Sequence, residues 1–260
     1  MLAAERHARI TAALRTDGAV KVVELAELLG VSEMTIRRDL DVLDDRELLR
    51  KVHGGAITRS NRGVELPSTA KAARQHAEKV AIGRAALGSV EDGMTVAISA
   101  GTTALELARL LHGRSLITVV TNSISIFQEL TGHPDEPNPV VYLTGGSRTP
   151  SDALVGPIAN AALHSFRVDA VFLGVHGFDI ESGLTSPNIA EAETNRALIS
   201  TSRRLFVLAD NTKYREVGTN VFGRMADIDT LVVDDGLDAS DRSALAPHVQ
   251  NILVAETEKE

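Results

Sequence analysis

Apolar residues recur at the spacing of amphipathic helices in three short segments at the start of the chain. The first predicted helix stops at Asp17, and the second, over 22–29, ends at Gly30, which suits the left-handed position after a helix. The third, over 33–45, follows Ser32, a good N-cap residue. The apolar positions of the three helices are Ile10, Ala13, Leu14, Val22, Val23, Leu25, Ala26, Leu29, Ile36, Leu40 and Leu43. The short connection between the second and third helices predicts a helix-turn-helix.

A small hairpin is predicted directly after these helices. Residues 48–52 lead into Gly54 and Gly55, and Ala56 and Ile57 follow. The hairpin completes a winged helix-turn-helix domain over residues 1–58. Residues 59–76 lack apolar periodicity and are expected to form a linker.

The pattern changes after residue 77 to short apolar runs that alternate with helical stretches. The runs are 95–98, 116–120, 140–143, 170–173, 205–209 and 230–233. Runs of this kind are typical of strands buried on both faces of a parallel sheet, and 103–111 and 123–130 suit covering helices. We therefore expect an α/β fold class, with a doubly wound, mostly parallel sensor domain over 77–255 and a frayed tail over 256–260.

Composition narrows the class of protein. The 260 residues include no cysteine, which excludes disulfides and thiolate zinc sites, and neither a metal nor another cofactor is expected. No apolar run is long enough to cross a bilayer, and the first twenty residues are charged, so a cytoplasmic protein is expected. The net charge of −8 opposes DNA binding by the chain as a whole. Basic residues nevertheless gather in one stretch, at Arg37, Arg38, Arg50, Lys51, His53, Arg59 and Arg62.

The third predicted helix is the candidate for reading DNA. Arginine can pair with guanine or with phosphate, and Ser or Thr hydroxyls can bind phosphate. The candidate DNA-binding residues of this helix and of the wing are Ser32, Met34, Thr35, Arg37, Arg38, Lys51 and His53. A solvated amphipathic helix with a charged face is the structural alternative.

Polar and glycine residues at strand ends form the candidate ligand site of the second domain. Gly101, Thr102 and Thr103 lie between a predicted strand and a predicted helix, where backbone N–H groups can hold a phosphate. Ligand crevices form at the carboxyl ends of parallel strands, so other strand ends are candidates too. The full candidate set is Ser99, Gly101, Thr102, Thr103, Thr121, Asn122, Gly145, Gly146, Asp169, Gly174, Asp210 and Lys213. Taken singly, these residues also suit tight turns, helix caps and a surface ion pair of Asp210 with Lys213.

The segment ELAELLGVSEMTIRRDLDVLDDRELLRKVHGGA resembles the head of DeoR-type bacterial regulators nearly position for position. The later segments SAGTT, VVTNS, LTGG, DAVFLGVHG, GLTSPN and LADNTKY follow the order seen in sensor domains of that family. The resemblance implies a sensor fold similar to ribose-5-phosphate isomerase and a phosphorylated sugar or related metabolite as effector. It also implies a repressor or, less often, an activator of a carbohydrate-use operon. Ser99 and Asn195 depart from the family pattern, so the resemblance carries over phosphate recognition rather than one particular sugar.

Two other functions remain open from the sequence. One is a sugar-phosphate isomerase-like enzyme with an added DNA-binding head, although no compact carboxylate or histidine constellation supports catalysis. The other is a DNA-bound scaffold with a silent sensor. For the regulator, the expected partners are double-stranded operator DNA and further copies of the chain, as a homodimer or homotetramer.

Overall fold

The computed structural model describes residues 3–17, 19–46, 48–52, 54–57, 68–132 and 137–258. The chain divides into two compact units, Met1–Asn61 and Arg62–Glu260. We call the first unit the head and the second the sensor. Within the described residues, no helix is both long and apolar enough to cross a membrane.

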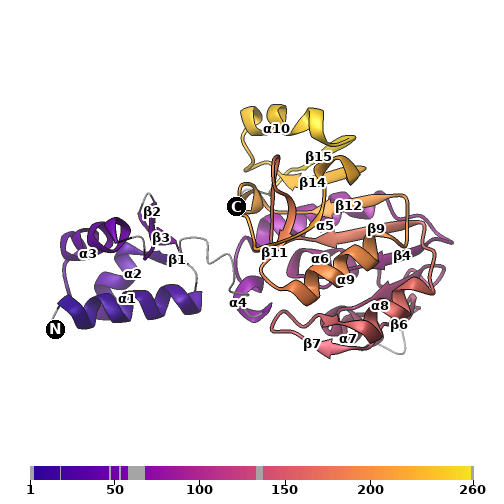
Figure 1. Ribbon diagram of the computed structural model, residues 1–260, viewed down its shortest axis with the longest axis horizontal. Coiled ribbons are helices and arrows are strands. Elements are labelled where there is room, and N and C mark those ends of the chain that lie inside the picture. The colour runs from indigo at the N-terminus through magenta and orange to yellow at the C-terminus, as the bar shows by residue number, and fades with distance from the viewer. Residues whose placement is uncertain are drawn as a thin grey trace. The chain divides into compact units, whose positions relative to one another are not determined.

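The head is a winged helix-turn-helix. Its elements, in order, are α1 (Ala3–Asp17), β1 (Ala19–Lys21), α2 (Val22–Leu29), α3 (Glu33–Asp45), β2 (Arg50–Val52) and β3 (Gly55–Ile57). The strands form an antiparallel sheet in the order β1-β3-β2, and β2 and β3 are the predicted wing (Figure 1). Strand β1 was not predicted.

The turn of the helix-turn-helix has the expected backbone geometry. Gly30 adopts φ +63° and ψ +38° at the end of α2, and its N–H bonds back to the helix. The Ser32 hydroxyl then accepts a hydrogen bond from the Thr35 N–H (3.3 Å) and caps α3. Of the predicted inner face of α2, Val22, Leu25 and Leu29 are buried, whereas Val23 is half exposed.

The sensor contains a parallel sheet of seven strands in the order β15-β14-β12-β9-β4-β5-β6. These strands are β4 (Thr95–Ile98), β5 (Thr118–Thr121), β6 (Val140–Leu143), β9 (Ala170–Gly174), β12 (Leu205–Leu208), β14 (Thr230–Asp234) and β15 (Asn251–Ala255). The six predicted runs correspond to all of them except β15. β6 lies at an edge of the sheet and exposes Val140 and Tyr142, so it is not buried on both faces as predicted.

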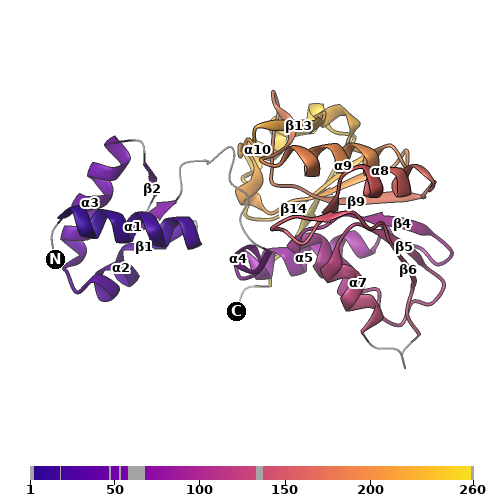
Figure 2. The same ribbon diagram turned by 60° about the horizontal axis from the view of Figure 1, so that its bottom comes forward.

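Helices cover both faces of this sheet (Figure 2). On one side are α5 (His76–Leu87), α6 (Thr102–Arg109) and α7 (Ile124–Thr131), which pack on Val96, Ile98, Phe172 and Phe206. On the other side are α8 (Pro157–His164), α9 (Ile189–Ile199) and α10 (Ala239–Leu245), around Val171, Leu173 and Val207. This is the doubly wound arrangement expected from the sequence.

Smaller elements complete the sensor. They are α4 (Ser68–Ala72), the hairpin of β7 (Ser147–Arg148) and β8 (Leu154–Val155), the antiparallel sheet of β10 (Gly177–Asp179), β11 (Gly183–Ser186) and β13 (Asn220–Gly223), and the 3-10 helices η1 (Asn211–Lys213), η2 (Met225–Asp227) and η3 (Ala246–His248). None of them was predicted. Helix α4 lies in the stretch expected to be a linker.

Candidate functional site

The first turns of α3 present the predicted DNA-reading residues to solvent. Met34 is 60% exposed, and Arg37 and Arg38 are exposed on the same helix. Arg37 donates to the Glu33 carboxylate (3.2 Å), an exposed pair that is easily exchanged for another anion. This end of α3 can therefore offer two guanidinium groups to a nucleic acid.

The other predicted contacts have different surroundings. Lys51 of β2 forms an ion pair with Asp41 of α3, which ties the wing to the recognition helix. His53 lies outside the described residues, as do Arg59 and Arg62. Ser32 and Thr35 bond to each other through their hydroxyl oxygens (3.0 Å) at the start of α3.

A buried carboxylate, not singled out by the sequence, fixes α3 against α1. Asp39 is 5% exposed and accepts hydrogen bonds from the Arg6 Nε (2.6 Å) and from the His7 ring (3.0 Å). Burial alone would raise the pKa of the Asp39 carboxyl, but the hydrogen bonds from Arg6 and His7 outweigh it and lower that pKa. The only sequence signal for this contact is that Asp39 follows the buried Ile36 by three residues, on the inner side of the helix.

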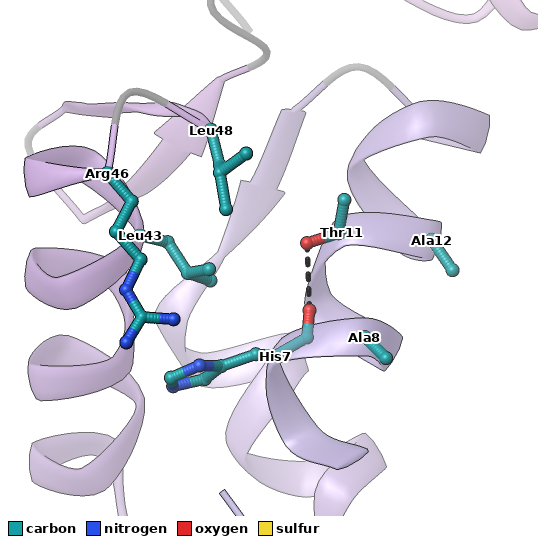
Figure 3. A pocket seen from close by; sticks show the side chains of 7 residues that line it. All are labelled: His7, Ala8, Thr11, Ala12, Leu43, Arg46 and Leu48. Carbon is teal, nitrogen blue, oxygen red and sulfur yellow. Dashed lines mark hydrogen bonds between the residues drawn. The ribbon is translucent and has the colours of Figure 1, made fainter. Parts of the chain in front are cut away.

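An open groove of about 640 Å³ lies beside this contact (Figure 3). Thr11 of α1 lines it, together with Arg46 and Leu48 from the chain at the end of α3. The groove thus lies at the end of α3 opposite to Met34 and Arg37, and it is not part of the predicted reading surface.

In the sensor, the order of the strands reverses between β4 and β9. The chain proceeds from β4 to β5 and β6 on one side, then returns to place β9 on the other side of β4. Loops that leave such a switch point diverge and open a crevice at the carboxyl ends of the strands. The loops here begin at Ser99 and after Gly174.

Several predicted residues meet at this switch point, where their side chains hold the backbone in place. The Ser99 hydroxyl accepts from the Gly174 N–H (2.9 Å). The Asn122 amide accepts from the Ala100 N–H (3.0 Å) and donates to the Leu154 carbonyl (3.1 Å). The Thr121 hydroxyl donates to the Ile98 carbonyl (2.7 Å). These buried side chains form a rigid frame for a ligand site.

A cavity of about 190 Å³ adjoins the frame. Gly101 and Thr102 line it at the start of α6, and Ser123 and Ser125 line it at the start of α7. Its remaining lining residues are Ser68, Thr69, Ala72, Leu105, Ser151 and Asp152. Gly101 adopts φ +150°, and none of the side chains that the structure describes caps α6, so the first N–H groups of that helix are available to an anion.

Basic side chains surround the same edge of the sheet. His176 follows β9, and Lys213 follows β12. Burial, followed by the charges of Lys213 and Lys71, lowers the pKa of His176 to about 4, so the imidazole is neutral at pH 7. Its Nε2 has no hydrogen-bond partner among the described residues, and the Glu216 carboxylate is 3.9 Å away.

The carboxylate of Glu191 is a hydrogen-bond acceptor near His176. The hydroxyls of Thr149 and Ser151 donate to the Glu191 Oε1 at 2.6 and 2.5 Å. Ser151 also lines the cavity, so Glu191 borders it through that hydroxyl. A ligand with both a phosphate and hydroxyl groups would find partners for each.

Of the twelve predicted ligand residues, Gly101 and Thr102 line the cavity and the other ten do not. Asp169 precedes β9, and its carboxylate accepts from the Thr95 N–H (2.8 Å) at the amino ends of the strands. Its assignment to the ligand site was wrong, because a residue before a parallel strand lies at the opposite edge of the sheet. Asp210 accepts from the Thr212 N–H (3.1 Å) and caps η1. Gly145 and Gly146 lie beside α8 and β8.

The sequence reasoning missed most of the cavity wall. Ser68, Thr69 and Ala72 fall in the expected linker, where no periodicity marked a helix. His176, which does not line the cavity, could have been noticed from the sequence, because it lies three residues after the predicted strand 170–173, between Gly174 and Gly177.

Comparisons with known proteins agree with this division of the chain. The family model of the DeoR-like helix-turn-helix domain matches residues 6–62, and that of the DeoR C terminal sensor domain matches residues 74–235. The transcriptional repressor AccR of Agrobacterium fabrum is 34% identical over 236 residues, which are 89% of this chain and 90% of that protein. The HTH-type transcriptional regulator GlpR of Haloferax volcanii is 35% identical over 246 residues, or 94% and 95% of the two chains.

Solved structures resemble the sensor more remotely. Ribose 5-phosphate isomerase A from Methanocaldococcus jannaschii is 15% identical, with a TM-score of 0.40, and the likeness covers 55% of this chain and 56% of that one. A likeness of this degree carries no conclusion about function. The full-length relatives are named as regulators and not as enzymes, which favours the regulator over the isomerase-like enzyme. The chain belongs to the DeoR family of transcriptional regulators, with an N-terminal DNA-binding domain and a C-terminal sensor domain.

Proposed function

We propose that this regulator is a cytoplasmic repressor of a carbohydrate-use operon and that a phosphorylated sugar or related metabolite releases it from its operator. The observation that carries the DNA-binding half is the exposed start of α3, with Met34, Arg37 and Arg38. The observation that supports the binding of a phosphorylated effector is the cavity at the uncapped start of α6.

The head reads DNA through Ser32, Met34, Thr35, Arg37 and Arg38, while Lys51 and His53 of the wing hold the backbone nearby. A recognition helix places its first turns against base edges in the major groove. Paired half-sites call for at least a homodimer, and a homotetramer satisfies the same geometry.

The sensor holds the phosphate at the first N–H groups of α6, beside Thr102 and Ser125. The dipole of α6 favours a dianion there, and Lys213 and Lys71 add positive charge at the same edge. The effector must bind the arrangement that releases DNA more tightly than the arrangement that binds it, because a ligand shifts an equilibrium only through that difference.

Fluorescence anisotropy with labelled promoter DNA tests the first half. Replacing Arg37 and Arg38 together by Ala should weaken binding at least about thirtyfold, since each arginine pair with a base or phosphate contributes roughly 1–3 kcal/mol. The salt dependence of binding should also become shallower. Arg203→Ala, an exposed arginine of the sensor, is the matched control and should bind as the wild type does. Wild-type affinity in the double variant would defeat the assignment of α3.

The same complex, titrated with a panel of phosphorylated sugars, tests the second half. One member should dissociate the DNA, whereas its unphosphorylated counterpart should have no effect. If no member changes the complex while DNA still binds, the effector proposal is wrong and the DNA-binding assignment stands.

A further inference from the structure

A buried lysine contacts the short helix α4, which forms one side of the proposed effector cavity. Lys79 of α5 is 3% exposed. Its ammonium donates to the backbone carbonyls of Lys71 and Arg74, each at 2.5 Å. These carbonyls belong to the last residues of α4 and to the turn after it, where helices leave acceptors unsatisfied. Lys79 therefore caps α4 from a neighbouring element.

A carboxylate does not account for the burial of Lys79. Among the residues that the structure describes, no acidic group lies within ion-pair distance of its ammonium. Burial lowers the pKa of Lys79 to about 8, and the charge of Asp210 opposes that change. The ammonium is thus protonated at pH 7 and directed at the end of α4, although a buried cation is costly to maintain.

The amino end of α4 is fastened separately. The Ser68 hydroxyl donates to the Asp152 carboxylate (2.8 Å), and the Ser68 N–H donates to the Pro150 carbonyl (3.3 Å). Asp152 also accepts from the Arg148 Nε (2.6 Å). Both ends of α4 are thereby attached to the sensor, one through Lys79 and the other through Asp152.

Between these attachments, α4 forms one side of the cavity. Ser68, Thr69 and Ala72 face the start of α6 across it. Helix α4 also lies close in sequence to the head. Strand β3 of the head ends at Ile57, and α4 is the next element described along the chain. Helix α4 is thus the first described element of the sensor that follows the head along the chain.

We propose that Lys79 is a positioning residue, which holds α4 as a wall of the effector cavity and so couples occupancy of that cavity to the chain leading to the DNA-binding head. This inference rests on the proposed effector site. It adds that α4 is the element through which binding of the effector and binding of operator DNA affect each other. Because such coupling is reciprocal, each ligand must alter α4 when it binds.

Hydrogen–deuterium exchange of the full-length protein tests the positioning role without an effector. Lys79→Met keeps most of the side-chain volume and removes the cation, so the amides of 68–74 should exchange at least about tenfold faster. The amides of β4 and β9 should be unchanged, which separates this outcome from general destabilisation. Arg84→Met removes an exposed cation of the same helix, α5, and is the matched control. Ser68→Ala loosens the other end of α4 and serves if Lys79→Met fails to fold. Unchanged exchange of α4 in a folded Lys79→Met variant would overturn the proposal.

Binding measurements test the coupling. The probes are inorganic phosphate and a panel of pentose and hexose phosphates, followed by calorimetry and by anisotropy on operator DNA. In Lys79→Met, probe affinity should fall at least about tenfold, and a given probe concentration should release less operator DNA than it releases from the wild type. In the wild type, operator DNA and probe should each change the exchange of α4.

The failures can be told apart. If α4 exchanges faster in Lys79→Met while the probe still binds and releases DNA as in the wild type, α4 does not couple the two sites and the inference is wrong. If no probe binds the wild type, the proposed effector site fails and the coupling fails with it. The exchange of α4 still reports whether Lys79 holds that helix.

Discussion

His176 lies two residues after β9 and is neutral at pH 7, although its Nε2 lacks a hydrogen-bond partner among the described residues. Its pKa of about 4 in the folded protein lies below the ordinary value of 6.5. Between these two values the unfolded chain binds more protons than the folded one. The contribution of the neutral imidazole to stability is therefore complete above pH 6.5 and is lost as the pH falls through this window.

Replacing His176 by Gln should flatten this pH dependence. From pH 7 to pH 4.5, the wild-type sensor should lose up to about 2 kcal/mol more unfolding free energy than His176→Gln, a figure already reduced for the partial exposure of the side chain. Urea unfolding at the two pH values measures the difference. Equal losses in the two proteins would show that His176 does not titrate as described.

Single residues also differ in how well the sequence predicts their place in the structure. Thr102 could be placed at a strand-to-helix junction because the flanking runs identify the strand and the helix. Asp169 was misplaced, although its position before the run 170–173 is enough to assign it to the opposite edge. The role of Lys79 could not be predicted, because its acceptors are backbone carbonyls, which every residue possesses.

At the scale of elements, α6 provides a direct test of phosphate binding at a helix start. Thr102→Asp places a carboxylate in the first turn, where it suits the helix dipole, so the sensor should remain as stable as the wild type or become slightly more stable. The same charge should repel a phosphorylated effector and weaken its binding at least about tenfold.

Thr102→Asn has nearly the same shape without the charge and is the control. It should bind the effector within a few-fold of the wild type. If Thr102→Asp retains effector binding, the phosphate does not lie at the start of α6. Thermal unfolding checks that both variants are folded.

Strong periodicity decided which elements could be predicted. The recognition helix 33–45 and the strand 95–98 match α3 and β4 at both ends, because a cap or a charged turn bounds a clear apolar pattern. The antiparallel sheet of β10, β11 and β13 was missed. Its strands have only three or four residues, and β13 is distant in sequence from its partner β11, since Leu184 pairs with Gly223. Helix α4 was missed because its five residues are held by contacts with Lys79 and Asp152 rather than by their own pattern.

At the scale of the whole molecule, the chain contains two units with separate cores. We expect two transitions in calorimetric unfolding, with the head carrying roughly a quarter of the total enthalpy, in proportion to its share of the residues. Operator DNA should raise the midpoint of the head transition, because it binds that unit in its folded form.

Gly30→Ala identifies the head transition. Gly30 has φ +63°, and an added Cβ would meet no atom within 4 Å, so the cost is conformational and about 1 kcal/mol. Only one of the two midpoints should fall, and it should be the one that operator DNA raises. A single transition that shifts as a whole would show that head and sensor unfold as one unit.

The frame of the effector cavity and its α4 wall are built from different kinds of contact. Ser99, Thr121 and Asn122 bond to backbone, so exchanging any of them disturbs the sheet edge itself. Thr69 and Ala72 instead line the cavity from a helix that is fastened at its two ends. If the proposed effector site is correct, substitutions at these two positions should alter which metabolite fits and leave the proposed phosphate-binding end at the start of α6 intact. In evolutionary terms, the proposed site would let a lineage acquire a new inducer through a few mutations in one short helix, without rebuilding the domain that contains it.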